Sequence, residues 1–323
     1  MFSMKSYKYN FISAYTDIIK EFLDFHQSLG FKYEAQQKQL KRFDRFIFSK
    51  GISEVNLNER IAKDFCLRLP NESQSTQNLR VSCIRSLAKF MISKGYEAYV
   101  YPPLPRGAYS HTYIPHVFTN QELRGFFKTA DKNILTNKKR GSAYSLIFRI
   151  LYGTGMRISE VLNLTVENVD FDKNIITVKH GKHNKDRLVP VHTELMIKFK
   201  DHLIENNLIY APKGFCFSRE KKPFSIDSVY RAFRKYLWET QIPHGGKEKG
   251  PRVHDFRHTF CVHRIRDWVK DKRDITALFP YLCAYLGHAD TRGTEYYFRL
   301  TAEFYPELVE RSERYWNGGD VNE

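Results

Sequence analysis

The sequence predicts a mainly α-helical protein with a small β-sheet, divided into two domains. Along most of its 323 residues, apolar side chains recur three and four positions apart, which is the spacing of an amphipathic helix. Residues 166–191 instead alternate around a polar turn, and this pattern indicates a β-hairpin. Residues 101–118 are proline-containing and show neither period, so they are expected to form an extended linker between the domains.

The first domain, residues 1–100, is expected to contain four helices. Their predicted ranges are 11–29, 34–49, 58–69 and 75–93. Gly30, Gly51, Pro70 and Gly95 follow them, and glycine and proline are residues that commonly end a helix. The second helix carries a basic outer stripe, which is either a solvated helix face or a contact for phosphate groups; it consists of Lys38, Lys41, Arg42 and Arg45.

The second domain is expected to span residues 119–323. Thr119 and Glu122 have the spacing of a helix capping box, so helical structure should restart there. Further helices are predicted at residues 142–152, 157–164, 193–205, 226–240, from 254 to a charged break at 270–274, and 275–286, with a short strand at 215–217 and an amphipathic tail at 302–316. Gly153 and Gly155 are expected to break the first of these helices and to place Arg157 at the start of the next.

The charge of the chain points to a polyanionic partner, with nucleic acid the leading class. The 52 Lys and Arg outnumber the 36 Asp and Glu, for a net charge of +16 and a pI near 9.5. Residues 1–110 carry 17 basic and 10 acidic side chains, and residues 111–323 carry 35 and 26. Both halves are therefore expected to contact a duplex, as a clamp, although evenly spread charge also favours solubility.

The cysteines and the apolar runs indicate a cytoplasmic protein. The five cysteines are widely spaced and form no C-x-x-C pair, so neither a disulfide framework nor a zinc site is expected. No stretch approaches 18 consecutive apolar residues, so secretion and membrane insertion are not expected.

Several residues suit phosphate chemistry, although each also has an ordinary alternative. His254 and Arg257 share a helix face, pairing a group that titrates near neutrality with a permanent phosphate binder. Arg157 is expected near helix-start N–H groups, which favour an anion. Lys182 and Lys185 lie in the hairpin turn, where either could reach into a groove. Taken one at a time, such residues are also typical of solvated turns and surface ion pairs.

Taken together and in order, the candidate residues carry a resemblance. The ordered set is Arg157, Lys182, His254, Arg257, His288 and Tyr297. The surrounding stretches are GTGMRISE at 153–160, GKHNKDRLVP at 181–190, HDFRHTF at 254–260 and LGHAD at 286–290. Over roughly residues 119–300 the chain resembles the catalytic domain of the tyrosine recombinase (phage integrase) family. The four N-terminal helices are similar in type and position to the family's SAM-like core-binding domain, which contacts DNA.

The resemblance implies a role for each residue and no cofactor or metal. Tyr297 would attack the scissile phosphate and become joined to its 3′ side, freeing a 5′-hydroxyl. Arg157 and Arg257 would bind the nonbridging oxygens, and Glu160 would orient Arg157. The remaining roles are proton transfer to the leaving oxygen by Lys182, proton acceptance from the tyrosine by His254, and a hydrogen bond to the phosphate from His288.

Two assignments have neighbouring alternatives. Tyr296 adjoins Tyr297, and the nine-residue spacing from His288 favours Tyr297. Lys185 is the second choice to Lys182, which directly follows the turn glycine as in the family. A type IB topoisomerase-like nicking enzyme and an inactive DNA-binding protein are the competing functions.

The resemblance also implies partners. A homo-tetramer on two double-stranded DNA sites is expected, with the C-terminal tail docked on a neighbouring protomer and with possible accessory recombinases or directionality factors. The loop at 245–251 resembles that of mobile-element integrases and transposases more than that of chromosomal dimer-resolving enzymes.

Overall fold

The structure is a computed structural model of the chain, and it divides into two compact units. The units are Met1–Thr112 and Tyr113–Glu323, so the division falls inside the stretch 101–118. The described residues are 10–31, 33–105, 114–136, 138–179, 181, 186–246, 250–287, 296–297, 300–301 and 305. Within these, no helix is both long enough and apolar enough to cross a membrane.

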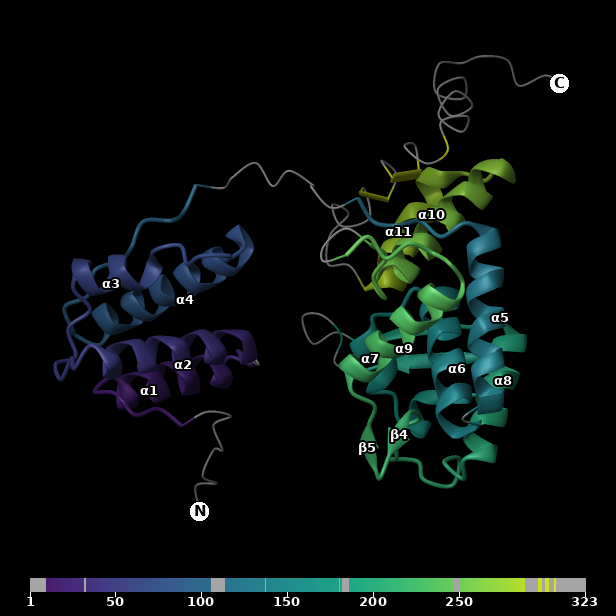
Figure 1. The fold of residues 1–323 in the computed structure, drawn as a ribbon, viewed down its shortest axis with the longest axis horizontal. Coiled ribbons are helices and arrows are strands. Elements are labelled where there is room, and N and C mark those ends of the chain that lie inside the picture. The colour runs from purple at the N-terminus through teal and green to yellow at the C-terminus, as the bar shows by residue number, and fades with distance from the viewer. Residues whose placement is uncertain are drawn as a thin grey trace, which may run out of the picture. The chain divides into compact units, whose positions relative to one another are not determined.

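The first unit is a cluster of four helices (Figure 1), and their buried side chains form one apolar core. The helices are α1 (Thr16–Ser28), α2 (Glu34–Ser49), α3 (Glu59–Cys66) and α4 (Gln74–Ser93). Asn58 and Ser73 cap α3 and α4, because their side chains accept hydrogen bonds from backbone N–H groups of the first turn. Phe22, Phe43 and Leu87 lie fully buried between the helices.

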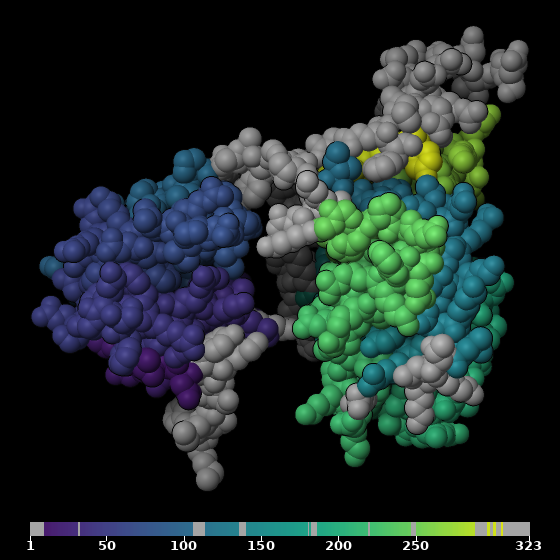
Figure 2. Space-filling model, viewed as in Figure 1, coloured from purple at the N-terminus to yellow at the C-terminus, as the bar shows by residue number. Residues whose placement is uncertain are grey.

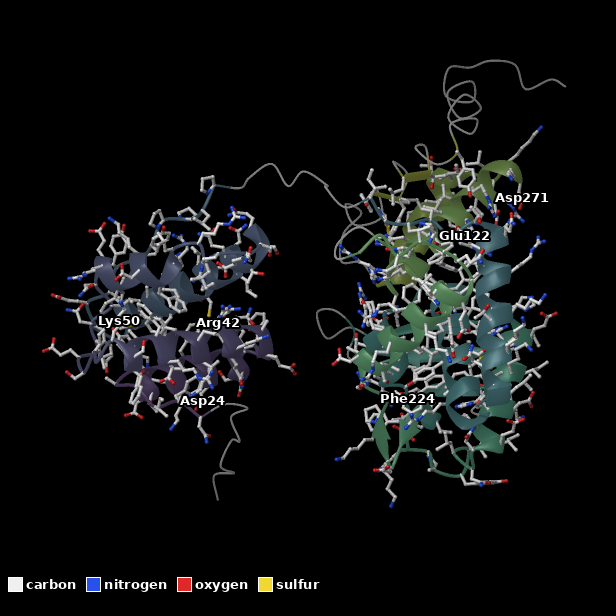
Figure 3. All side chains as sticks on the ribbon, in the orientation of Figure 1. Asp24, Arg42, Lys50, Glu122, Phe224 and Asp271 are labelled. Atoms are coloured by element: carbon white, nitrogen blue, oxygen red, sulfur yellow. The ribbon has the colours of Figure 1, made fainter. Side chains whose placement is uncertain are left out.

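Helix α1 begins later than the expected residue 11. The buried carboxylate of Asp44 accepts hydrogen bonds from the backbone N–H groups of Ile12 and Ser13. These bonds hold residues 12 and 13 outside a helix, and α1 starts at Thr16 instead. The predicted basic stripe of α2 is largely exposed, and Figure 3 shows Arg42 projecting from this helix. Lys41 is the exception in this stripe. Its side chain is partly buried, and its Nζ lies 3.2 Å from Oδ2 of Asp44.

The second unit is mainly helical and contains a small antiparallel sheet. Its helices are α5 (Asn120–Thr136), α6 (Lys138–Thr154), α7 (Ile158–Leu162), α8 (Thr193–Glu205), α9 (Ile226–Glu239), α10 (Asp255–Lys270) and α11 (Ile275–Leu286). The predicted capping box before α5 is confirmed: Thr119 N–H donates to Glu122, and Glu122 N–H donates to the Thr119 hydroxyl. Helices α10 and α11 lie at one end of the unit, and the short strands β4 (Ser218–Arg219) and β5 (Lys222–Pro223) lie at the other (Figure 1). Residues 243–246, which follow α9, are exposed at the surface of this unit (Figure 2).

The sheet differs from the predicted hairpin. Residues 166–179 form a short 3-10 helix, η1 (Val166–Asn168), then β1 (Val169–Asp170) and β2 (Ile175–Val178), and β2 pairs with β3 (Arg187–Pro190). The cause is a turn: the Asp170 carboxylate accepts N–H bonds from residues 172 and 173. The strand expected at 215–217 is a single bridge from Phe215 to Thr165, followed by the hairpin β4 (Ser218–Arg219) and β5 (Lys222–Pro223).

Gly153 does not break α6 as predicted. The helix runs through it to Thr154 and ends at Gly155, whose φ of +61° lies in the left-handed region. A Cβ atom on Gly155 would stand 2.6 Å from a ring carbon of Phe260 on α10. Glycine therefore lets the turn after α6 pass directly over α10, and this close approach delivers Arg157 toward residues of α10.

Candidate active site

Arg157 stands at the start of α7, as the sequence predicted, and is held there by Glu160. Its backbone N–H donates to Glu160 Oε2 at 2.9 Å, and its guanidinium Nη1 donates to Glu160 Oε1 at 2.9 Å. The carboxylate thus fixes both the turn and the direction of the arginine side chain. One quarter of the Arg157 side chain remains exposed, so the guanidinium can still meet a ligand.

Glu160 is shared with a second arginine that the sequence did not single out. Arg187, at the start of β3, donates to both carboxylate oxygens of Glu160, at 3.0 and 2.7 Å, and to the carbonyl of Tyr285 at 2.9 Å. Burial raises the pKa of Glu160, but the bonds from Arg187 and Arg157 outweigh it and lower the pKa to about 2. Glu160 is therefore a permanent anion between two arginines.

Arg257 on α10 is 2% exposed and holds two loops at once. Its Nη1 donates to the carbonyl of Gly155 at 2.7 Å, and its Nη2 donates to the carbonyl of Leu286 at 2.8 Å. The first carbonyl belongs to the turn before Arg157, and the second ends α11 just before Gly287. One guanidinium therefore ties the segments on either side of α10 to that helix.

Tyr297 is buried against α10 and lies beside Arg257. The side chain is 3% exposed and packs in an apolar cluster with Phe260, Ile265 and Leu286. Burial raises the pKa of the Tyr297 phenol, and the Arg257 guanidinium partly opposes that rise. The hydroxyl is thus placed at the arginine but is kept neutral.

Two histidines of α10 connect this tyrosine with the rest of the site. The ring centroid of His258 lies 4.9 Å from that of His254 and 5.5 Å from that of Tyr297. His254 stands at the N-cap of α10 with part of its side chain open to solvent. The surrounding protein and the charges of Arg257 and Arg157 nevertheless lower the pKa of His254 to about 4, so the ring is neutral at pH 7.

Four of the six predicted residues are therefore placed, and they come together. Arg157, His254, Arg257 and Tyr297 lie where the start of α7 and the first turns of α10 meet residues 296–297. Lys182 and His288, and the second-choice Lys185, lie outside the described residues. The neighbouring Gly181 and Gly287 are described.

Sequence reasoning missed Arg187 and His258 as members of the site. His258 had a readable signal, because it directly follows Arg257 in the stretch that carries the resemblance. Arg187 also lies within a matching stretch, but its partners are 27 and 98 positions away along the chain, beyond any helix or strand period.

Comparisons with known proteins point to one family. The model of the phage integrase family matches residues 116–303. Tyrosine recombinase XerA of Thermococcus onnurineus is 31% identical, over 79% of this chain and 82% of its own length. Tyrosine recombinase XerA of Pyrococcus furiosus is 28% identical, over 92% of this chain and 94% of its own.

Solved structures share the fold. The XerH site-specific recombinase in a post-cleavage complex with its palindromic difH substrate has a TM-score of 0.60 at 20% identity, covering 88% of this chain and 79% of that one. An integrase of the Tn1549 transposon, in complex with a circular intermediate DNA, has a TM-score of 0.57 at 17% identity, covering 87% and 94%. The chain therefore belongs to the phage integrase family, and it is a tyrosine-type site-specific DNA recombinase.

Proposed function

We propose that the enzyme cuts and rejoins DNA through a bond between Tyr297 and the 3′ side of the scissile phosphate. The observation that carries this proposal is the position of the Tyr297 phenol beside the Arg257 guanidinium, with Arg157 and His254 at the same junction. A guanidinium binds two phosphate oxygens, and a phenol can form a covalent intermediate with the phosphorus between them.

In the proposed cleavage step, Tyr297 Oη forms a bond to phosphorus while the bond from phosphorus to the 5′-oxygen breaks. Arg157 and Arg257 stabilise the charge that develops on the nonbridging oxygens. The phenol proton passes to His254, and the 5′-oxygen takes a proton from Lys182. The phosphotyrosine bond keeps the energy of the phosphodiester, so a 5′-hydroxyl from another strand can reverse the step.

The electrostatics of the free site suit this assignment of the base. Because the pKa of His254 is lowered to about 4, its ring is unprotonated at neutral pH and can accept a proton. An arriving phosphate adds negative charge beside the ring, which favours the protonated form once the proton has moved. His288 would add a hydrogen bond to the phosphate.

A nicked duplex that loses a short 5′ end after cleavage tests the proposal, because it traps the covalent complex. Tyr297→Phe removes one oxygen and should abolish the covalent complex while leaving DNA affinity within about threefold. The matched control is Tyr296→Phe, which removes the neighbouring oxygen and should still be trapped. The reverse pattern would move the nucleophile to Tyr296.

We further propose that the substrates are the ends of a mobile element, integrated or excised with the possible help of accessory recombinases or directionality factors. The loop before His254 supports this, and the likeness to a transposon integrase is compatible with it. The alternative is a recombinase of the chromosomal dimer-resolving kind, to which the loop at 245–251 is less similar. Mapping the cleaved phosphate on the ends of the DNA that encodes the protein, and on the flanking chromosome, separates the two.

Recombination of two sites needs several protomers, and we propose a homo-tetramer joined by the C-terminal tail. The sequence supports it: residues 298–323 carry a net charge of −3 in a basic protein and have apolar residues at helical spacing. Deleting residues 302–323, which are outside the described residues except 305, should preserve binding to one site and weaken paired-site complexes in native mass spectrometry. Normal tetramers and strand exchange after the deletion would contradict this assembly.

A further inference from the structure

We infer that Arg187 is a positioning residue that holds the phosphate-binding arginine and the end of α11 in one arrangement. The inference rests on the proposed function, because it acts through Arg157. Arg187 is 9% exposed at its side chain and lies at the first position of β3. Its side chain joins two segments that carry predicted site residues, and its backbone belongs to the strand that follows a third.

The first link of Arg187 is to α7. It donates from Nη1 and Nη2 to the two oxygens of Glu160, at 3.0 and 2.7 Å, which is the two-pronged geometry that a guanidinium makes with a carboxylate. The same Glu160 oxygens accept the backbone N–H and the Nη1 of Arg157. Arg187 thus fixes the carboxylate that in turn directs Arg157.

The second link is to α11. Arg187 Nε donates to the carbonyl of Tyr285 at 2.9 Å, in the last turn of that helix. Gly287, in the left-handed conformation with a φ of +67°, packs so closely that an added Cβ atom would be 3.2 Å from Arg187 Cδ. The residue that follows Gly287 is the predicted phosphate ligand His288, so the arginine sets the starting point of that segment.

The third link is through the chain itself. Arg187 is the first residue of β3, five positions after the predicted catalytic Lys182 in the sequence, and β3 is registered against β2 by the pairing of Val178 with Arg187. One residue therefore contacts α7 and the last turn of α11 through its side chain, and belongs to the paired strands β2 and β3 through its backbone. A shift of about 1 Å in such groups is enough to slow a reaction about a hundredfold.

The charge state of Glu160 allows the positioning role of Arg187 to be distinguished from a role in packing alone. The groups that face Glu160 are Arg157 from α7, Arg187 from β3, and His254 and Arg257 from α10. Without Arg187, burial still disfavours the ionised form of Glu160. The hydrogen bonds from Arg187, which stabilise that form most, are lost. The pKa of Glu160 must then rise, and protonation would release Arg157 as the pH falls.

The experiment compares Arg187→Met and Arg187→Lys with wild type in the trapped-cleavage assay, at saturating DNA and from pH 8 to pH 5. Arg187→Met should lower the maximal cleavage rate about a hundredfold and change the apparent Kd less than about threefold. Its residual rate should fall more steeply toward pH 5 than that of wild type. Arg187→Lys keeps the positive charge but cannot make the paired hydrogen bonds to Glu160. Its cleavage rate should therefore lie between those of wild type and Arg187→Met.

Arg149→Met is the matched control. Arg149 also pairs with a carboxylate, Asp131 at 2.8 Å, in the same unit but away from the site residues, so its loss should change rate and pH profile less than about threefold. Thermal melts and DNA binding establish that each variant is folded. If Arg187→Met does not fold, Arg187→Lys carries the comparison.

Either folded Arg187 variant with the wild-type rate and pH profile would overturn the inference. A uniform loss of activity that follows the loss of thermal stability, with no change in pH profile, would also overturn it. Failure of the proposed function looks different, because wild type itself would then trap no DNA on Tyr297.

Discussion

At the scale of single residues, the site depends on guanidinium groups that hold several partners at once. Arg257 is the most buried of them, and its two terminal nitrogens each meet a backbone carbonyl, on Gly155 and on Leu286. A buried cation is costly unless it is hydrogen-bonded, and a planar fork can satisfy two carbonyls that face it from different segments. The nearby Tyr297 hydroxyl shares the same cation.

Arg257→Lys should therefore be far from conservative. An ammonium cannot reach both carbonyls, so one buried acceptor loses its partner at about 1–3 kcal/mol, and the proposed two-pronged contact with the phosphate would be lost as well. We expect the trapped-cleavage rate to fall at least about a hundredfold and the melting temperature to drop by several degrees. Arg264→Lys, on an exposed face of the same helix, is the control and should leave both near wild type.

Residue roles were predictable where the partners are close in sequence. The pair of Arg157 and Glu160 was readable because its members are three positions apart at a helix start. The buried state of Tyr297 was not readable, since it depends on α10 packing against a short segment some 30 residues later. Arg187 was missed for the same reason, because the chain must fold before its guanidinium meets Glu160 and Tyr285.

At the scale of elements, the end of α6 decides where Arg157 lies. Gly155 has a φ of +61° and no room for a side chain, because Phe260 fills the space. Gly155→Ala should cost about 1–2 kcal/mol in backbone strain and about 1–3 kcal/mol more in overpacking, measured by denaturant unfolding.

The control for this glycine is Gly246→Ala. Gly246 has a φ of +86° with nothing within 4 Å of an added Cβ atom, so only the backbone strain should appear. Equal losses in the two variants would show that the contact with Phe260 does not shape the turn.

Helix α10 also makes stability depend on pH. Burial is the first cause that lowers the pKa of His254 to about 4, of His258 to about 3 and of His263 to about 4. In the unfolded chain these histidines become protonated as the pH falls through about 6.5. In the folded protein they stay neutral until the pH reaches their lowered pKa values. Stability is therefore complete above pH 6.5 and is lost progressively as the pH falls toward 4.

We expect the melting temperature to fall between pH 7 and pH 5. His263→Gln removes one titrating ring and retains a hydrogen-bonding group near Tyr152, so it should reduce this fall. The exposed His244→Gln should not change it. A melting temperature that is constant or rises on acidification would contradict the lowered pKa values.

The ends of helices were predicted correctly from the sequence where a capping residue marks them. The ends of the strands were not predicted correctly. Ser225 caps α9, and Asp274 and Gly287 bound α11, so both helices lie within a residue of their predicted ranges. The stretch 166–179 has an alternating pattern that hid a turn, because the deciding bonds come from the Asp170 carboxylate rather than from apolar spacing.

At the scale of the whole molecule, both units are basic. The net charge is +7 for residues 1–112 and +9 for residues 113–323. If both units contact DNA, each expressed alone should bind more weakly than the full chain and show a shallower dependence of affinity on salt. Full affinity from one unit alone in a salt-titrated binding assay would exclude the two-unit clamp.

The central claim is that Tyr297 becomes joined to DNA in a site built from arginines. The most direct measurement is peptide mapping by mass spectrometry of the complex trapped on a nicked duplex in excess EDTA. We predict a peptide carrying a 3′-linked nucleotide on Tyr297, because in the proposed mechanism the arginines and Lys182 would supply the charge stabilisation that a metal ion otherwise gives. A nucleotide on Tyr296, or a complex that forms only when magnesium is restored, would contradict the account.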